Sequence, residues 1–199
     1  SDLYRDATHL CGHRPTGARN WEAWIKDTRD NELYRVVFMP DNKWWLAQNL
    51  KYAGTGAQAN WCTKDECGRL YTQTQAKGSS GYGANQQGIC PAGWFLPVVK
   101  NYQDILNAYS ATVSEHCKIL TPLDSKCPTN DHYGLAALKS CVQEGDASVA
   151  GIVRLYVNDA ADVNDYEIND ILGYTPFDCG YAWVSNNTIL KLVRCIRQL

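Results

Sequence analysis

Two cysteine-containing segments that lie far apart in the chain constrain its fold more than any other feature. Residues Cys90–Pro97 place a cysteine, a turn and a tryptophan close together, and Val193–Arg197 is a short apolar strand with a cysteine at its centre. We expect the two segments to form two halves of one core. A bridge between Cys90 and Cys195 would close a loop of roughly 105 residues, worth about 4–5 kcal/mol in the chain-entropy model and less if strained.

The cysteine content indicates an oxidising compartment. The chain has nine cysteines in 199 residues, and their spacing includes neither a Cys-x-x-Cys pair nor a zinc-type quartet with histidine. Disulfides persist mainly in secreted and surface proteins, so we expect a secreted or cell-surface protein. The odd number leaves at least one thiol unpaired or paired outside the chain. The sequence shows no signal peptide and no apolar run of membrane length, and its start at Ser1 without methionine suggests a mature or trimmed fragment.

Length and charge predict one domain that does not bind nucleic acid. The hydrophobic content of 45% and the seven tryptophans argue against disorder. The net charge is −2, and no basic face of the kind that binds nucleic acid is visible. We expect an N-terminal arm over residues 1–25 and a domain over residues 26–199. Whether the arm joins the core stays open; Trp21, Trp24 and Ile25 fall at helical spacing and favour a short docked helix.

The pattern of apolar residues predicts strands near both ends of the domain. Residues 34–38 and 43–47 flank a turn at residues 40–42 and predict a hairpin. Later strands are expected over residues 149–157, 181–185 and 190–196. With helices between these groups, the order of elements favours an α+β domain whose first and last strands meet.

The middle of the chain predicts helices and exposed loops. Apolar side chains recur there at the i, i+3, i+4, i+7 spacing of an amphipathic helix: Tyr102, Ile105, Leu106 and Tyr109. A second helix is expected over about residues 110–120. Residues 77–88, rich in Gly, Ser and Asn, predict an exposed loop. The acidic, Asn-rich residues 158–170 predict another.

Four motifs follow one another along the chain in a characteristic order. They are Asn49–Tyr52 after Trp44-Trp45, Cys67–Thr72, Cys90–Pro97 and Val193–Arg197, preceded by a polar turn and strand over residues 27–37. In this order they resemble the Fibrobacter succinogenes major paralogous (FISUMP) domain. The resemblance covers roughly residues 26–199, and the Gly-Arg-Leu-Tyr-Thr and Cys-Pro-x-Gly-Trp-x-Leu-Pro segments are specific in combination and weak singly.

The resemblance implies a C-type-lectin-like fold with a disulfide-braced antiparallel sheet. Proteins of this family lie on bacterial surfaces, often at the end of adhesins or pilins. The resemblance also implies the disulfides Cys62–Cys67 and Cys90–Cys195. Cys11 on the arm is expected to remain unpaired. Two further bridges are expected among the other four cysteines, Cys117, Cys127, Cys141 and Cys179.

The chain departs from the family pattern at three places. Phe95 stands where the family usually has histidine, and Pro97–Val99 lacks the usual polar cap before the helix. Residues 142–190 match the family poorly. Because lectin-like folds of this kind also serve as scaffolds diversified by retroelements in their late segment, we expect this chain to be a candidate variable protein.

The late segment, about residues 165–188, is the candidate binding surface. Aromatic residues are interleaved there with short polar ones, and this mixture combines rigid contact area with adaptable hydrogen bonds. The candidate ligand-binding residues are Tyr166, Asn169, Tyr174, Phe177, Asp178, Tyr181, Asn186 and Asn187. The alternative is that such rings belong to the core, which we expect for Trp183. If this segment does not bind, residues 77–88 are the next candidate.

The sequence predicts no metal, cofactor or catalytic residue. Calcium needs several converging oxygens, and the acidic loop could supply some from Asp159, Asp162, Asn164, Asp165, Glu167, Asn169 and Asp170. Its spacing does not match an EF-hand, and the lectin calcium motifs are absent, so a solvated loop is expected. His116 neighbours Cys117 in sequence, but in a cysteine-rich chain we expect that cysteine to be half of a disulfide.

These observations predict a non-enzymatic, cell-surface ligand-binding domain of the adhesin or pilus-tip type. The expected partners are a protein or glycan on a host or neighbouring cell surface and other pilus or adhesin subunits. Two alternatives stay open. One is an enzyme or enzyme-accessory domain on a lectin-like fold, and the other is a structural module of a surface assembly.

Overall fold

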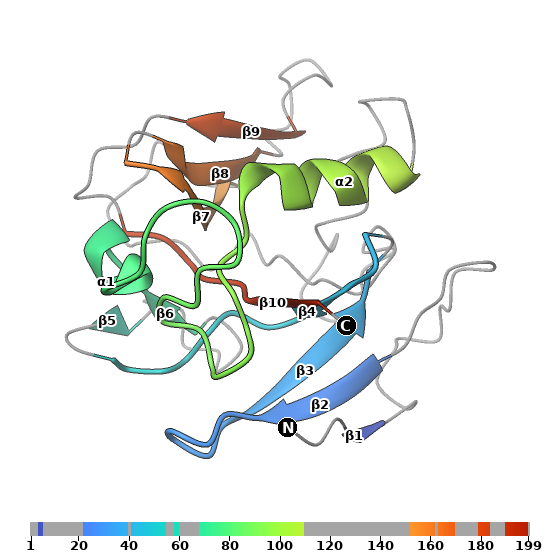
Figure 1. The fold of residues 1–199 in the computed structure, drawn as a ribbon, viewed down its shortest axis with the longest axis vertical. Helices are drawn as coiled ribbons and strands as arrows, with labels where there is room; N and C mark the ends of the chain where they lie inside the picture. The colour runs from blue at the N-terminus through green and yellow to red at the C-terminus, as the bar shows by residue number, and fades with distance from the viewer. Residues whose placement is uncertain are drawn as a thin grey trace.

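The computed structural model has a mixed α+β fold (Figure 1). It describes residues 4–5, 22–39, 41–54, 58–59, 68–109, 152–161, 163–169, 179–183 and 190–198. The predicted α+β class is confirmed. None of the helices in these ranges is long and apolar enough to cross a membrane.

The largest described sheet is antiparallel and has the order β1-β2-β3-β4-β10. Its strands are β1 (Tyr4–Arg5), β2 (Glu22–Lys26), β3 (Leu33–Phe38), β4 (Lys43–Leu46) and β10 (Ile196–Gln198). The predicted hairpin is confirmed as β3 and β4. The last strand joins the sheet of the first strands, as expected, and pairs with β4, where Ile196 lies opposite Trp45.

A second antiparallel sheet has the order β7-β8-β9. Its strands are β7 (Ile152–Ala160), β8 (Val163–Asn169) and β9 (Cys179–Trp183). The predicted strands near residues 149–157 and 181–185 correspond to β7 and β9. A small third pair consists of β5 (Gln58–Ala59) and β6 (Arg69–Leu70).

Two helices lie within the described ranges, α1 (Gln73–Lys77) and α2 (Val99–Tyr109). The short helix α1 is not predicted from the apolar pattern; a capping box between Thr72 and Gln75 starts it. Helix α2 confirms the predicted amphipathic helix. Its Tyr102 and Ile105 are fully buried, and the Tyr102 ring packs edge-on against Trp45 of β4 at 4.8 Å between ring centroids.

Three local predictions were wrong. Trp24 and Ile25 lie in strand β2 rather than in a short helix, because β2 pairs along its length with β3 and buries Ala23 and Ile25. Most of the acidic residues 158–170 lie in strands β7 and β8. The pairing of β8 with β7 overrides the loop preference of Asn and Asp. The predicted strand over residues 190–196 consists of isolated bridges at Lys191 and Leu192 and becomes continuous only from Ile196.

The segment of residues 190–196 links the two larger sheets. Tyr156 of β7 donates a backbone hydrogen bond to Leu192, and Leu46 of β4 donates one to Cys195. In Figure 1 this red segment runs between the sheet that contains β7 and the sheet that contains β3. Its residues from Lys191 to Ile196 are all buried. The segment therefore forms the middle of the fold.

The predicted bridge between Cys90 and Cys195 is confirmed. The two Cα atoms are 5.8 Å apart, the residues are separated by 105 positions, and both side chains are fully buried. Their neighbours in the core include Trp94 and Val193, so the two cysteine segments do form one core. Cys62 and Cys67 lie outside the described residues, as do Cys11, Cys117, Cys127 and Cys141.

Candidate binding surface

Residues 78–88, here called the Tyr82 loop, connect the end of α1 to the first disulfide cysteine. The loop contains no charged residue. Tyr82 lies at its centre with 41% of its surface exposed; among the large hydrophobic residues that the structure describes, the other exposed one is Leu33 at the start of β3. An exposed tyrosine between two glycines is a candidate contact residue for a ligand.

A buried asparagine on β7 holds the backbone on both sides of Tyr82. Asn158 is fully buried, and its side-chain Nδ2 donates to the carbonyl oxygens of Gly81 and Gly83, each at 3.0 Å. The backbone N–H of Gly83 donates in turn to the main-chain oxygen of Asn158 at 2.6 Å. The loop is therefore fixed at the two residues that flank the exposed ring.

A buried tyrosine orients this asparagine. The hydroxyl of Tyr156 donates to the Oδ1 atom of Asn158 at 2.9 Å. Burial raises the pKa of the Tyr156 hydroxyl far above its ordinary value, with smaller contributions in the same direction from Tyr82 and Asp159. The hydroxyl thus keeps its proton and remains a donor, which leaves both Nδ2 hydrogens of Asn158 for the loop.

The ring of Tyr82 is placed by two side chains from α1. Gln73, which is 4% exposed, donates from Nε2 to the Tyr82 hydroxyl at 3.3 Å and to the carbonyl oxygen of Ala161 at 3.1 Å. Ala161 lies in the β7–β8 turn, so the ring stands beside that turn. The Lys77 ammonium is 5.2 Å from the ring centroid and donates to the carbonyl oxygen of Ser80 at 2.6 Å. The position of the tyrosine is therefore defined by α1, the helix that precedes its loop.

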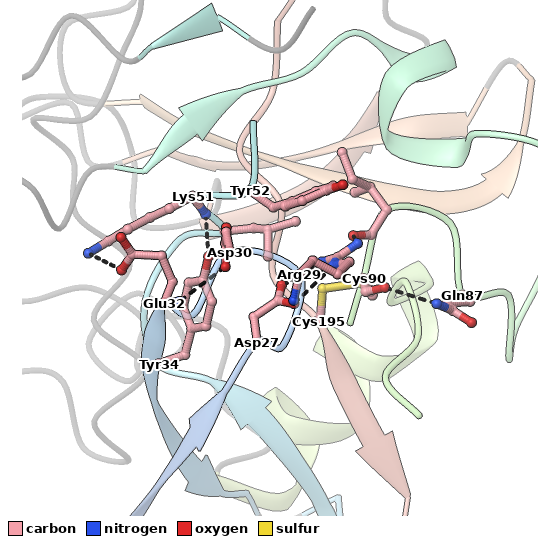
Figure 2. Close-up of polar contacts among 12 residues, drawn as sticks. Asp27, Arg29, Asp30, Glu32, Tyr34, Lys51, Tyr52, Gln87, Cys90 and Cys195 are labelled. Carbon is pink, nitrogen blue, oxygen red and sulfur yellow. Dashed lines mark hydrogen bonds and ion pairs between the residues drawn. A yellow bond between two sulfur atoms is a disulfide. The ribbon is translucent and has the colours of Figure 1, made fainter. Parts of the chain in front are cut away.

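The far end of the Tyr82 loop is held by a charged brace (Figure 2). Arg29, in the turn between β2 and β3, donates to the carbonyl oxygen of Ile89 at 2.8 Å and to the carboxylate of Asp27 at 2.6 Å. Its guanidinium lies 3.8 Å from the centroid of the Tyr52 ring. Figure 2 shows this brace next to the disulfide of Cys90. The loop thus enters a rigid part of the core.

The brace itself does not have the character of a ligand site. The Asp27 side chain is 1% exposed and is neutralised by Arg29, whose Nε also donates to it at 2.9 Å. Nearby, the backbone of Lys51 donates to the Tyr34 hydroxyl at 2.8 Å, and its ammonium lies 3.7 Å from Glu32. These groups form hydrogen bonds and ion pairs with one another and join three chain segments. We assign them a structural role.

Gly88 shows why the end of the loop requires glycine. Its φ of +52° lies in the left-handed region, and a Cβ atom there would lie 2.5 Å from the carbonyl oxygen of Ala76 and closer still to the side chain of Leu96. The close approach lets Ile89 donate to Ala76 and Leu96 donate to Gln86 through their backbones. Any side chain at this position would push the loop away from α1.

The structure places three of the predicted binding residues on the sheet that carries Asn158. Tyr166 lies on β8 opposite Leu155 and Ala182, and Asn169 ends the same strand opposite Ile152. Tyr181 lies on β9 opposite Glu167. The other candidates lie outside the described residues: Tyr174, Phe177, Asp178, Asn186 and Asn187.

The acidic residues considered for calcium do not gather where the structure describes them. In the described part of the chain, no group of three or more His, Cys, Asp or Glu side chains could hold a metal ion. The carboxylate of Asp159 instead accepts a hydrogen bond from the backbone of Val99.

Sequence reasoning treats residues 77–88 as an exposed loop and as the second candidate for the binding surface, and it misses the role of Asn158. The one local signal for this surface is the triplet Gly81-Tyr82-Gly83 in an uncharged segment. Compared with models of protein families, with curated proteins and with solved structures, the chain gives no match. The candidate surface therefore rests on its geometry alone.

Proposed function

We propose that this protein is a ligand-binding domain of a bacterial surface protein, with a C-type-lectin-like fold of the FISUMP type, and that it catalyses no reaction. The observation that carries the proposal is Tyr82, an exposed ring whose two flanking glycines are fixed by a buried asparagine.

Preorganisation explains why such a loop suits binding. Ordering a flexible loop at an interface costs free energy that is subtracted from the affinity. The Tyr82 loop is already held by Asn158, by helix α1 and by the brace at Ile89. Tyrosine adds a large contact area at a small cost in side-chain entropy. The loop can therefore bind with little further loss of freedom.

The late segment, about residues 165–188, extends the proposed surface. Its strands β8 and β9 belong to the sheet whose strand β7 provides Asn158. We propose that its aromatic and amide residues contact the same ligand, and that this segment is the one diversified among related chains. An adhesin or pilus tip, on a cell surface where buried disulfides persist, is the setting that suits such a domain.

The test is to present the purified protein to an array of glycans and cell-surface proteins. Tyr82→Ala should weaken binding at least about tenfold, or about 1.4 kcal/mol, and should shift the melting temperature by less than about 2 °C because the side chain is exposed. Leu33→Ala is the matched control, since it removes a hydrophobic side chain of similar exposure, 50% against 41%, from another part of the chain. Equal binding by the wild type and Tyr82→Ala would refute the role of the loop.

A second set of variants tests the late segment separately. Tyr174→Ala, Phe177→Ala and Asn187→Ala should each weaken binding while the domain stays folded. If these changes unfold the protein, the rings belong to the core. If they change neither stability nor binding, the binding surface consists of the Tyr82 loop without the late segment.

A further inference from the structure

We propose that the Tyr82 loop binds neutral glycans without a metal ion, by stacking a sugar ring on Tyr82. This inference rests on the proposed function, because it names the ligand class of the same surface. Three properties of the loop support it, namely its lack of charge, its exposed ring and its exposed hydrogen-bonding groups.

The absence of charge disfavours ionised ligands. Residues 78–88 include no Asp, Glu, Lys, Arg or His. The neighbouring cation is Lys77, whose ammonium donates to the carbonyl oxygen of Ser80, and the neighbouring carboxylate of Asp159 accepts from Val99. Apart from that one ammonium, a charged ligand group that lost its water on this loop would meet only uncharged residues. A neutral ligand avoids that cost.

The exposed ring suits the apolar face of a sugar. The face of an aromatic ring carries partial negative charge, whereas the C–H groups on one side of a pyranose carry partial positive charge and form a flat patch. Lys77 approaches the ring of Tyr82, yet 41% of the tyrosine remains exposed. Because the flanking glycines are fixed, the ring is held ready for stacking.

The polar groups of the loop suit hydroxyl groups, which both donate and accept hydrogen bonds. Ser79 and Asn85 are exposed in the same loop, and a hydroxyl and a carboxamide each offer a donor and an acceptor. Asn85 is held with a φ of +61°, a conformation that asparagine tolerates better than most residues. Groups of this kind can hydrogen-bond the hydroxyls of a sugar.

A peptide ligand is the less favoured occupant. Peptides usually bind by adding a strand to a sheet edge or by placing side chains in apolar grooves. The Tyr82 loop is not a strand, and Tyr82 is the large hydrophobic residue that it exposes. One ring with polar neighbours fits a small, hydroxyl-rich ring better than an extended chain.

The experiment uses the whole chain and immobilised polysaccharides. Mannan, galactan and β-glucan serve as neutral probes, polygalacturonate and heparin as acidic probes, and a panel of cell-surface proteins completes the set, all with and without EDTA. At least one neutral polysaccharide should be bound equally with and without EDTA. Tyr82→Ala should weaken that binding at least about tenfold, whereas Tyr82→Phe, which keeps the ring, should stay within about threefold of the wild type. Leu33→Ala should bind like the wild type.

The outcomes separate this inference from the proposed function. Binding that depends on Tyr82 but is confined to acidic polysaccharides or proteins would overturn the neutral-glycan inference and leave the proposed function standing. Loss of neutral-glycan binding in EDTA would also overturn the inference, because it would show recognition through a metal. The absence of any binding that depends on Tyr82 would overturn both.

Discussion

The carboxylate of Asp159, at the end of β7, accepts a 2.8 Å hydrogen bond from the backbone N–H of Val99, the first residue of α2. The sequence before this helix lacks a polar cap, and the side chain of Asn101 compensates in part by accepting from Val98 at 2.8 Å. The start of α2 is thus capped by a residue 60 positions away in the sequence. This contact ties the helix to the sheet β7-β8-β9.

The first prediction concerns the charge of this cap. Burial raises the pKa of Asp159 above its ordinary value, and the hydrogen bond from Val99 opposes the shift only in part. A carboxyl whose folded pKa is raised stabilises the fold fully below its unfolded pKa of about 4 and loses that contribution as the pH rises through the folded value. Asp159→Asn keeps an acceptor for Val99 but cannot ionise. Its stability relative to the wild type should therefore improve from pH 3 to pH 7, as measured by urea denaturation.

Two further variants serve as controls for this cap. Asp159→Ala removes the acceptor and should cost about 0.5–2 kcal/mol, as for other lost caps, with the smaller cost at pH 7 because alanine cannot ionise either. Asp104→Asn removes a carboxylate from an exposed pair with Lys100 on the same helix. Its stability relative to the wild type should be the same at pH 3 and at pH 7. A relative stability of Asp159→Asn that falls between pH 3 and pH 7 would contradict the predicted sign.

The second prediction concerns the disulfide. Replacing both Cys90 and Cys195 with alanine releases a constraint over 105 positions and should lower the free energy of unfolding by about 2–5 kcal/mol. Urea denaturation of the two proteins measures the difference, and peptide mapping without reduction verifies the bridge in the wild type. Detection of Cys90 or Cys195 as a free thiol would contradict the structure.

The third prediction concerns Gly88. Gly88→Ala should destabilise the fold by at least about 2 kcal/mol, because it combines left-handed strain with a clash against Ala76 and Leu96. The matched control is Gly93→Ala. Gly93 also has a positive φ, of +79°, but no atom within 4 Å of an added Cβ, so its cost should be only about 1 kcal/mol of strain. Equal melting temperatures for the two variants would show that the end of the loop is loosely packed.

The fourth prediction concerns the hold of Asn158 on the Tyr82 loop. Asn158→Ala removes both donors to Gly81 and Gly83 and leaves the buried Tyr156 hydroxyl without its acceptor, so it should cost about 1–3 kcal/mol. Amide hydrogen exchange across residues 79–86 should become at least about tenfold faster, since local opening governs exchange in such segments.

The control for this prediction is Asn101→Ala. Asn101 is also a buried asparagine, but it accepts from the backbone of Val98 outside the loop. Exchange in the Tyr82 loop should not change in this variant. Equal acceleration by both substitutions would mean that the loop responds only to global stability.

Elements that follow a local pattern could be predicted from the sequence. Helix α2 follows the helical spacing of Tyr102 and Ile105, whose burial provides the reason for that spacing. Strand β3 follows the alternation of Tyr34 and Val36, both of which point into the core. The bridge between Cys90 and Cys195 followed from the resemblance to a family, together with the expectation that the two cysteine segments form one core.

The remaining features depend on partners that are distant in the sequence. Trp24 and Ile25 fit a helical spacing as well as a strand over so few residues, and only pairing with β3 decides between them. Asn158 stands in an acidic, Asn-rich stretch that favours a loop, and its hydrogen bonds span 75 and 77 positions. No local pattern encodes such contacts, so the sequence does not predict the hydrogen bonds from Asn158 to the two glycines beside Tyr82.

The central place of residues 190–196 has a consequence for how the protein folds. This segment receives backbone hydrogen bonds from Leu46, Leu50, Tyr71 and Tyr156, so the core stays incomplete until it arrives. Folds dominated by such distant pairings are slow to form and expose unpaired strand edges meanwhile. While the chain is being synthesised, the earlier strands cannot complete the core until residues 190–196 are available to pair with them. A chaperone that shields β4 and β7 in that interval would therefore raise the yield of native protein.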